Sequence, residues 1–147
     1  MDTIKPLYTA SATATGGRNG RTESSDGALR AELSVPKAMP GNPGSITPEH
    51  LFAAGYAACY CGAIEFVAKQ HGKDGTKARV TADVSIGHRA GGGFGLAVKL
   101  RVVDASLPQA ELAVFAREAH KNLCPYSHAL RGNVDVQIEV KGASDDL

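Results

Sequence analysis

The stretch TPEHLFAAGYAACYCGAIEFVAKQHG, residues 47–72, decides the fold of this chain. Residues 51–64 within it carry no charged side chain. This run is too short to span a bilayer but suits a helix that is buried on nearly every side. Its glycines and alanines leave little side-chain bulk, so another helix or backbone can approach closely. The sequence therefore predicts a long core helix.

Both ends of this helix are marked by local signals. Thr47 can cap the N-terminus, Pro48 suits the first helical position, and the helix dipole favours a carboxylate such as Glu49 in the first turn. At the other end, Gly72 is a typical stop signal. The helix is therefore expected to begin at residue 47 or 48 and to fade near residue 71.

Two thiols, Cys59 and Cys61, lie in the middle of the predicted helix. Residues two positions apart on a helix point about 200° apart, so these thiols cannot easily bond to each other. A thiol in apolar surroundings has a raised pKa and is inert unless a cation is brought to it. The residues alone leave two interpretations open for Cys59: a small packing residue, or a nucleophile that another part of the chain activates. The packing interpretation applies more strongly to Cys61.

The rest of the chain predicts a single α+β domain covering residues 1–147. Alternating segments and turn signals predict strands at residues 7–15, 21–25, 28–35, 77–88, 94–103 and 133–141. Apolar residues on one face predict a second helix over residues 108–123. A polar tail at about residues 142–147 is expected to fray.

Cys124 and Pro125 interrupt the second helix. Proline at the first position of a short following helix would make Cys124 its N-cap. In that position the sulfur would face unpaired backbone N–H groups, which favour the thiolate. The alternative is a small buried cap without chemistry.

Composition excludes several functional classes. The 147 residues include 16 Lys and Arg against 15 Asp and Glu, with no long run of either sign, so nothing indicates nucleic acid or an anionic membrane surface. Residues 1–6 lack the features of a secretory signal, which predicts a cytoplasmic protein with reduced thiols. The five histidines are scattered and no second cysteine pair follows, so no metal site is predicted.

Three segments resemble motif blocks of the organic hydroperoxide resistance protein family, which is related to the osmotically induced protein C (OsmC) family. They are ATATGGRNGR (12–21), TPEHLFAAGYAACY (47–60) and CPYSHALRGNVDV (124–136). The similarity covers nearly the whole chain, in order. It implies a thiol-dependent peroxidase that reduces organic and lipid hydroperoxides, with no metal, haem or flavin. It also implies dihydrolipoamide or lipoylated proteins as the reductant, and an intertwined homodimer in which antiparallel sheets wrap central helices.

The resemblance assigns a role to four residues. Cys59 matches the peroxidatic cysteine and Cys124 the resolving cysteine, which implies a Cys59–Cys124 disulfide after oxidation. Arg18 matches an arginine that activates the thiolate, and Glu49 a glutamate that orients this arginine. A guanidinium can lower a thiol pKa, and a carboxylate can hold the guanidinium through a bidentate bond, so these roles are chemically consistent. Cys61 departs from the family pattern, and Tyr126 and His128 receive no catalytic role.

One geometric constraint follows from these assignments. On a straight helix, Glu49 and Cys59 would be about 15 Å apart along the axis, too far to share one compact site. Either the helix begins late or bends, or Arg18 and Glu49 act on the Cys59 of the other subunit. Phe52, Tyr56 and Phe94 are candidates to line the path of an alkyl tail.

Two alternative functions stay open. One is an OsmC-type peroxidase with broader substrate and reductant use. The other is a non-catalytic binder of small apolar ligands in which the cysteines are merely buried.

Overall fold

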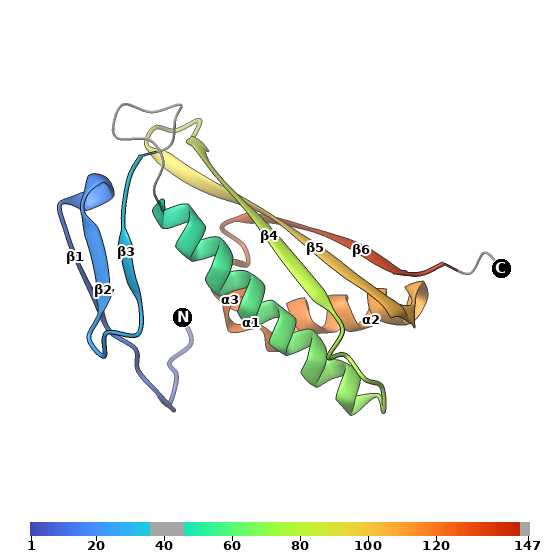
Figure 1. Cartoon of the computed structure of the whole chain (residues 1–147). Helices are drawn as coiled ribbons and strands as arrows, with labels where there is room; N and C mark the ends of the chain where they lie inside the picture. The colour runs from blue at the N-terminus through green and yellow to red at the C-terminus, as the bar shows by residue number, and fades with distance from the viewer. Residues whose placement is uncertain (36–45, 145–147) are drawn as a thin grey trace. The chain divides into compact units, whose positions relative to one another are not determined.

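The computed structural model describes residues 1–35 and 46–144 of the chain. The chain divides into two compact units, Met1–Pro48 and Glu49–Leu147 (Figure 1). The described residues contain both helices and strands, arranged in two three-stranded sheets. The predicted α+β class is therefore confirmed.

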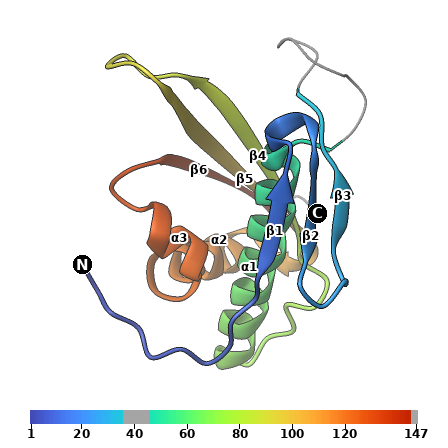
Figure 2. The same cartoon turned by 90° about the vertical axis from the view of Figure 1, so that its left-hand side faces the viewer.

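The first unit contains a three-stranded antiparallel meander, drawn in blue in Figure 2. Its strands are β1 (Ala12–Thr15), β2 (Arg21–Ser24) and β3 (Arg30–Glu32). The three strands were predicted, but β1 and β3 are shorter than expected. The first residue of β1, Ala12, pairs with the last residue of β2, Ser24. The strand pair extends no further, because the turn from β2 to β3 begins directly after Ser24.

A one-turn 3₁₀ helix, Gly17–Asn19, connects β1 to β2 and carries Arg18. Gly16 and Gly17 have φ values of 78° and 61°, which side chains with a Cβ atom rarely adopt. A Cβ at Gly20 would lie only 1.8 Å from the carbonyl oxygen of Thr15. The three glycines of GGRNG are therefore required by the backbone of this turn.

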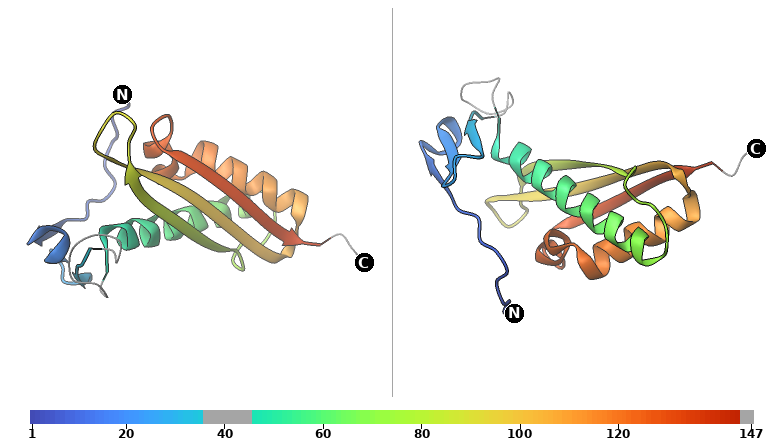
Figure 3. Two further views of the ribbon diagram at one scale, coloured as in Figure 1. Left: turned by 90° about the horizontal axis from the view of Figure 1, so that it is seen from above. Right: turned by 60° about the horizontal axis from the view of Figure 1, so that its bottom comes forward.

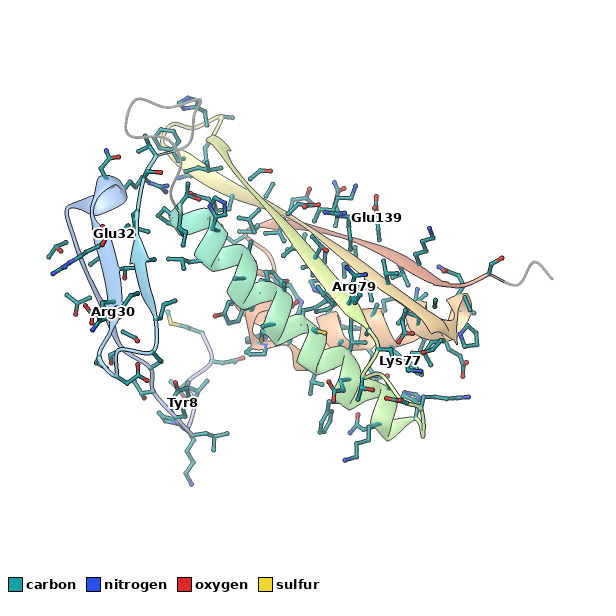
Figure 4. The ribbon with its side chains drawn as sticks, viewed as in Figure 1. Tyr8, Arg30, Glu32, Lys77, Arg79 and Glu139 are labelled. Carbon is teal, nitrogen blue, oxygen red and sulfur yellow. The ribbon has the colours of Figure 1, made fainter. Side chains whose placement is uncertain are left out.

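The β2–β3 hairpin is closed by the predicted Ser-Asp-Gly turn. The Asp26 carboxylate accepts hydrogen bonds from the Ser24 hydroxyl at 2.6 Å and from the Ala28 N–H at 3.0 Å. The hydrogen bond from Ser24, followed by the one from Ala28, lowers the pKa of Asp26. Across the strands, Arg30 forms an ion pair with Glu23 at 3.0 Å; Arg30 and its neighbour Glu32 are labelled in Figure 4.

The long helix α1 (Pro48–Gln70) forms as predicted, with Pro48 as its first residue. It ends at Gln70, where Gly72 adopts a φ of 72° and the Lys73 N–H donates to the Ala68 carbonyl at 2.8 Å. By length and composition alone α1 could cross a membrane, with a mean hydropathy of 1.5 over 18 residues, but a core helix meets the same criteria.

The expectation that α1 is buried on nearly every side is wrong for the single chain. One face is buried in the core of the second unit. The fully buried residues of this face are Tyr56, Tyr60, Ala63, Ile64, Val67 and Ala68. Ala54, Ala58, Gly62 and Phe66 lie on the other side and are exposed, because no element of the second unit covers them. Within the second unit, one face of α1 is therefore packed in the core and the other is exposed.

The second sheet contains β4 (Arg79–His88), β5 (Phe94–Pro108) and β6 (Asp135–Ala143), with β5 in the middle. β4 and β5 form the predicted antiparallel hairpin, and β5 is longer than expected. β6, however, runs parallel to β5, so the expectation of purely antiparallel sheets is wrong here. The helical segments between β5 and β6 explain the difference, because a helical crossover can return the chain to the end where β5 began.

The predicted helix over 108–123 is divided into two parts. Helix α2 (Gln109–Glu118) is followed by a π-helical turn, Ala119–Leu123, and then by the short helix α3 (Pro125–Leu130). Both α1 and α2 lie on the same face of the second sheet (Figure 3). Helix α3 lies beside the middle of α1 (Figures 1 and 2).

The core of the second unit fills the space between these helices and the sheet. Its members include Tyr56, Tyr60, Ile64 and Val67 of α1, Val98, Leu100 and Val102 of β5, and Leu112, Phe115 and Ala116 of α2. Cys124 belongs to this core and Cys59 packs against it. The fold therefore brings thiols from two distant parts of the sequence to the same apolar interior.

The opposite face of the second sheet is polar. Arg101 donates two hydrogen bonds to Asp83, at 2.8 and 2.9 Å, and Lys99 pairs with Glu139 at 2.6 Å. Glu139 points to the side away from α1 and α2 (Figure 4). These exposed ion pairs join neighbouring strands and contribute little to stability individually. The second unit thus separates an apolar, thiol-bearing face from a charged one.

Candidate active site

Cys59 and Cys124 lie side by side in the second unit. The Cys124 thiol donates a hydrogen bond to the Cys59 sulfur, and the two Sγ atoms are 3.6 Å apart. Cys59 stands in the middle of α1 and is partly buried, whereas Cys124 is 1% exposed. Both cysteines are free thiols. A small movement of either residue would bring the sulfurs to bonding distance.

The start of α3 fixes the position of Cys124. Pro125 is the first residue of α3 and Cys124 is its N-cap, as predicted. The Cys124 N–H donates to the Ala119 carbonyl at 2.8 Å, which closes the π-helical turn. The Cys124 side chain makes no capping hydrogen bond, so the expectation that its sulfur faces the free N–H groups of α3 is wrong. The sulfur turns instead toward Cys59.

Burial is the main influence on the Cys59 thiol and raises its pKa to about 11. The hydrogen bond from Cys124 also raises this pKa, while a hydrogen bond from the backbone N–H of Tyr126 lowers it. With a pKa of about 11, only about one thiol in ten thousand is deprotonated at pH 7. A positive group beside Cys59 would lower this pKa and raise the share of reactive thiolate.

Aromatic rings cluster on α1 and α3 near the thiols. The ring of Tyr126 lies 6.3 Å from that of Phe52 and 5.8 Å from that of Tyr56. A Cβ at Gly55 would lie 3.0 Å from the Tyr126 hydroxyl, so glycine lets this ring rest on α1. Phe94, also expected to line the site, instead stacks on His88 at the β4–β5 turn, with ring centroids 4.9 Å apart.

A buried polar cluster lies next to these rings and was missed by the sequence analysis. The Ser127 hydroxyl is 2.7 Å from the Tyr56 hydroxyl and 2.8 Å from Nδ1 of His120. Tyr56 and Ser127 are both fully buried. The only signal in the sequence was the place of Ser127 within the block CPYSHALRGNVDV. Tyr56 is 71 positions away from Ser127, so no local pattern could connect them.

The environment of His120 leads to a prediction about stability. Burial, and then the positive charge of Arg131, lowers the pKa of His120 below the ordinary histidine value of about 6.5. Between the lowered pKa and about 6.5 the unfolded chain binds more protons than the folded chain. The free energy of unfolding should therefore fall as the pH drops below about 6.5, and should not depend on His120 above it.

Urea unfolding of the wild type and of His120→Asn between pH 5 and pH 8 checks this prediction. The difference in stability between the two proteins should be largest above about pH 6.5 and shrink below it, since the variant cannot take up the proton. A difference that stays constant over the whole range would contradict it.

Arg18 and Glu49 are found in separate elements. Arg18 stands in the 3₁₀ turn of the first unit, and Glu49 lies in the first turn of α1. Because α1 is one helix from Pro48 to Gln70, it does not begin late, and Glu49 is about 15 Å from Cys59 along its axis. The structure thus brings Cys59 and Cys124 together but not Glu49 and Cys59 of one chain. The roles of Arg18 and Glu49 remain predictions.

Cys61 belongs to different surroundings from Cys59. Its thiol donates to the carbonyl of Ala78 at 3.4 Å, and burial raises its pKa, followed by the negative charge of Glu65. Among the residues that the structure describes, no group of three His, Cys, Asp or Glu side chains could hold a metal ion.

Comparisons with known proteins identify the family of this chain. The family model described as OsmC-like protein matches residues 41–139. The organic hydroperoxide resistance protein of Xanthomonas axonopodis pv. citri is 49% identical over 140 residues, which cover 91% of this chain and 94% of that protein.

Solved structures give the same result. A crystal structure of an organic hydroperoxide resistance protein from Legionella pneumophila has a TM-score of 0.88 and 43% identity, covering 93% of this chain and 99% of that one. The organic hydroperoxide resistance protein OhrB of Bacillus subtilis has a TM-score of 0.82 and 40% identity, covering 92% and 100%. The chain therefore belongs to the OsmC-like family and, within it, to the organic hydroperoxide resistance proteins.

Proposed function

We propose that this protein is a thiol-dependent peroxidase that reduces organic and lipid hydroperoxides to alcohols. The observation that carries the proposal is the pair of free thiols, Cys59 and Cys124, whose sulfurs are 3.6 Å apart. Two Xanthomonas relatives with 49% identity are named organic hydroperoxide resistance proteins, which supports hydroperoxide detoxification. The aromatic cluster formed by Phe52, Tyr56 and Tyr126 makes the surroundings of the thiols apolar, which suits an alkyl chain better than hydrogen peroxide.

In the proposed mechanism Cys59 is the peroxidatic cysteine. Its thiolate attacks the peroxide oxygen, the O–O bond breaks, and an alcohol leaves once the alkoxide has taken up a proton. Cys59 is left as a sulfenic acid, which condenses with the Cys124 thiol to a disulfide and releases water. A dithiol must then reduce the disulfide, and dihydrolipoamide or a lipoylated protein is the proposed donor. The cycle requires no metal or bound cofactor.

Arg18 is the proposed source of the missing positive charge. A guanidinium next to Cys59 would offset the burial that raises the thiol pKa to about 11. It would also stabilise the charge that develops on the departing alkoxide. Glu49 would orient the guanidinium through a bidentate hydrogen bond.

We further propose that the active form is an intertwined homodimer in the cytoplasm. The bare side of α1, with Ala54, Ala58, Gly62 and Phe66 exposed, supports this proposal because it offers a close approach to another copy. Glu49 lies about 15 Å along α1 from Cys59 of its own chain. Arg18 and Glu49 of one subunit would then serve Cys59 of the other.

Turnover measured with competing reductants tests the proposed function. The wild type should consume tert-butyl hydroperoxide with dihydrolipoamide as the donor, and one equivalent of peroxide should remove two thiols. Equal use of several thiol donors and of hydrogen peroxide would indicate the OsmC-type alternative. If no donor supported peroxide consumption, the remaining alternative would be a non-catalytic binder of apolar ligands. The raised pKa of Cys59 would then be that of an unreactive, buried thiol.

Replacement of the resolving cysteine gives a separate prediction. Cys124→Ser should allow one oxidation of Cys59 and then stop, because no nearby thiol remains to close the disulfide. Excess peroxide should convert the stalled sulfenic acid to sulfinic acid. Mass spectrometry of the intact chain should show a gain of one oxygen and then of two. Repeated turnover by this variant with dihydrolipoamide would contradict the role of Cys124.

A further inference from the structure

Three hydrogen-bonded side chains lie beside the two thiols, and their hydroxyl and imidazole groups have no role in the mechanism above. They are Tyr56, Ser127 and His120, named the Ser127 cluster below. The Ser127 hydroxyl stands between the other two, at 2.7 Å from the Tyr56 hydroxyl and 2.8 Å from Nδ1 of His120. Ser127 and Tyr56 are both 0% exposed. Such a buried network is maintained only when each of its polar groups has a partner.

The Ser127 cluster joins the three segments that determine where the thiols lie. Tyr56 is on α1, three residues before Cys59, and the two share a helical face. Ser127 is on α3, three residues after Cys124, and His120 belongs to the π-helical turn before it. Ser127, which follows Cys124, is thus bonded to α1 through Tyr56, and His120, which precedes Cys124, is bonded to Ser127.

A second contact supports the same segments. The Arg131 guanidinium, at the end of α3, donates to the carbonyl of His120 at 2.6 Å. Because this bond joins the end of α3 to the π-helical turn, the loop that carries Cys124 is closed on itself. This hydrogen bond therefore adds to the N-cap geometry of α3 in holding the segment that carries Cys124.

Tyr60 shows that a buried tyrosine on α1 does not need such a network. Its hydroxyl is also fully buried, but it donates to the backbone carbonyl of Ala116 at 2.6 Å. This bond satisfies the hydroxyl without reaching α3 or the π-helical turn. The hydrogen bond between Tyr56 and Ser127 satisfies a buried hydroxyl and also joins α1, which carries Cys59, to α3, which has Cys124 as its N-cap.

We propose that Ser127, held between Tyr56 and His120, is a positioning residue for the resolving step. It holds Cys124 where its thiol closes on oxidised Cys59 before a second hydroperoxide arrives. This inference rests on the proposed peroxidase function and adds a determinant of its resistance to overoxidation.

Two reactions compete for the oxidised Cys59. In closure, the Cys124 sulfur attacks the Cys59 sulfur, the S–O bond of the sulfenic acid breaks, and the hydroxyl leaves with the thiol proton as water. In overoxidation, a second hydroperoxide transfers an oxygen to the sulfenic acid and leaves as an alcohol. Only closure depends on the position of Cys124. The two sulfurs are 3.6 Å apart and must approach by about 1.5 Å to form the disulfide. A misplaced Cys124 would therefore slow closure but not overoxidation.

The test compares closure with the first oxidation in the full-length chain. Ser127→Ala is mixed with cumene hydroperoxide in a stopped-flow instrument, and products are identified by thiol titration and intact mass. The first oxidation should keep its wild-type rate, whereas closure should be slower by about tenfold. The fraction of sulfinic acid formed at a given excess of peroxide should rise correspondingly. A general loss of folding would slow both steps.

Variants of the two neighbours distinguish positioning from packing. Tyr56→Phe removes the hydroxyl bonded to Ser127, and Tyr60→Phe is its matched control on the same helix. Closure should be slowed in the first variant and unchanged in the second. His120→Asn retains a polar atom near the place of Nδ1 and should keep most of the closing rate, while His120→Leu should resemble Ser127→Ala.

The inference would be overturned if Ser127→Ala and Tyr56→Phe closed the disulfide at the wild-type rate. It would also be overturned if Tyr60→Phe slowed closure as much as Tyr56→Phe. Absence of any peroxide consumption by the wild type would be a different failure. It would remove the proposed function itself, and the inference with it.

Discussion

Cys59→Ser is expected to abolish peroxide turnover. A serine hydroxyl is not ionised at neutral pH and does not take an oxygen atom from a peroxide to form a sulfenic acid, so the first step has no nucleophile. Turnover with dihydrolipoamide should fall by roughly a thousandfold or more, the scale seen when a nucleophile is removed from an enzyme. Cys124 should stay reduced, because without an oxidised Cys59 it has nothing to resolve.

Cys61→Ser is the matched control for this experiment. This variant also replaces a thiol sulfur by oxygen, two residues further along the same helix. The Cys61 thiol, however, donates to the carbonyl of Ala78 and not to Cys124. Its turnover should be close to that of the wild type. If Cys59→Ser retained turnover and Cys61→Ser lost it, the assignment of the peroxidatic residue would be wrong.

Arg18→Ala is expected to slow peroxide reduction at pH 7 by about ten- to a thousandfold. An adjacent cation lowers a thiol pKa by about one to three units, and far below the pKa each unit changes the thiolate fraction tenfold. Burial raises the pKa of Cys59 to about 11, so the rate of the variant should keep rising toward that pH. The wild-type rate should level off at a lower pH. The measurement is the second-order rate of the first oxidation from pH 6 to pH 11.

Two further variants sharpen this test. Arg21→Ala removes the same charge from the start of β2, in the same meander, and should leave the pH profile unchanged. Arg18→Lys keeps the positive charge but loses the guanidinium, which could form a bidentate hydrogen bond with a carboxylate such as Glu49. An oxidation rate between those of the wild type and Arg18→Ala is therefore expected. If Arg18→Ala had the wild-type rate and profile, Arg18 would have no part in the mechanism.

Features controlled by neighbouring residues were predictable from the sequence. The bounds of α1 follow from Pro48 at its start and Gly72 just beyond its end. The turn that carries Arg18 requires its glycines, and Pro125 places Cys124 at the start of α3. Each of these depends on the conformational limits of one or two residues, which do not change with tertiary context.

Features that depend on distant partners were not predictable in the same way. The direction of β6 is set by pairing with β5, and the same alternating pattern suits a parallel or an antiparallel neighbour. The apolar spacing over residues 108–123 reads as one helix, although a π-helical turn interrupts it. Cys59 and Cys124 were paired through family resemblance. The Ser127 cluster was missed, because hydrogen bonds across 71 positions leave no periodic signal.

The parallel pairing of β6 with β5 has a consequence for how the protein is made. Synthesis proceeds from the N-terminus, so the nascent chain completes β4 and β5 well before residues 135–143 emerge. Until then β5 has a free edge, and the helices have only part of the sheet to pack on. The sheet on which the thiol-bearing helices pack is therefore complete only after residues 135–143 have been made.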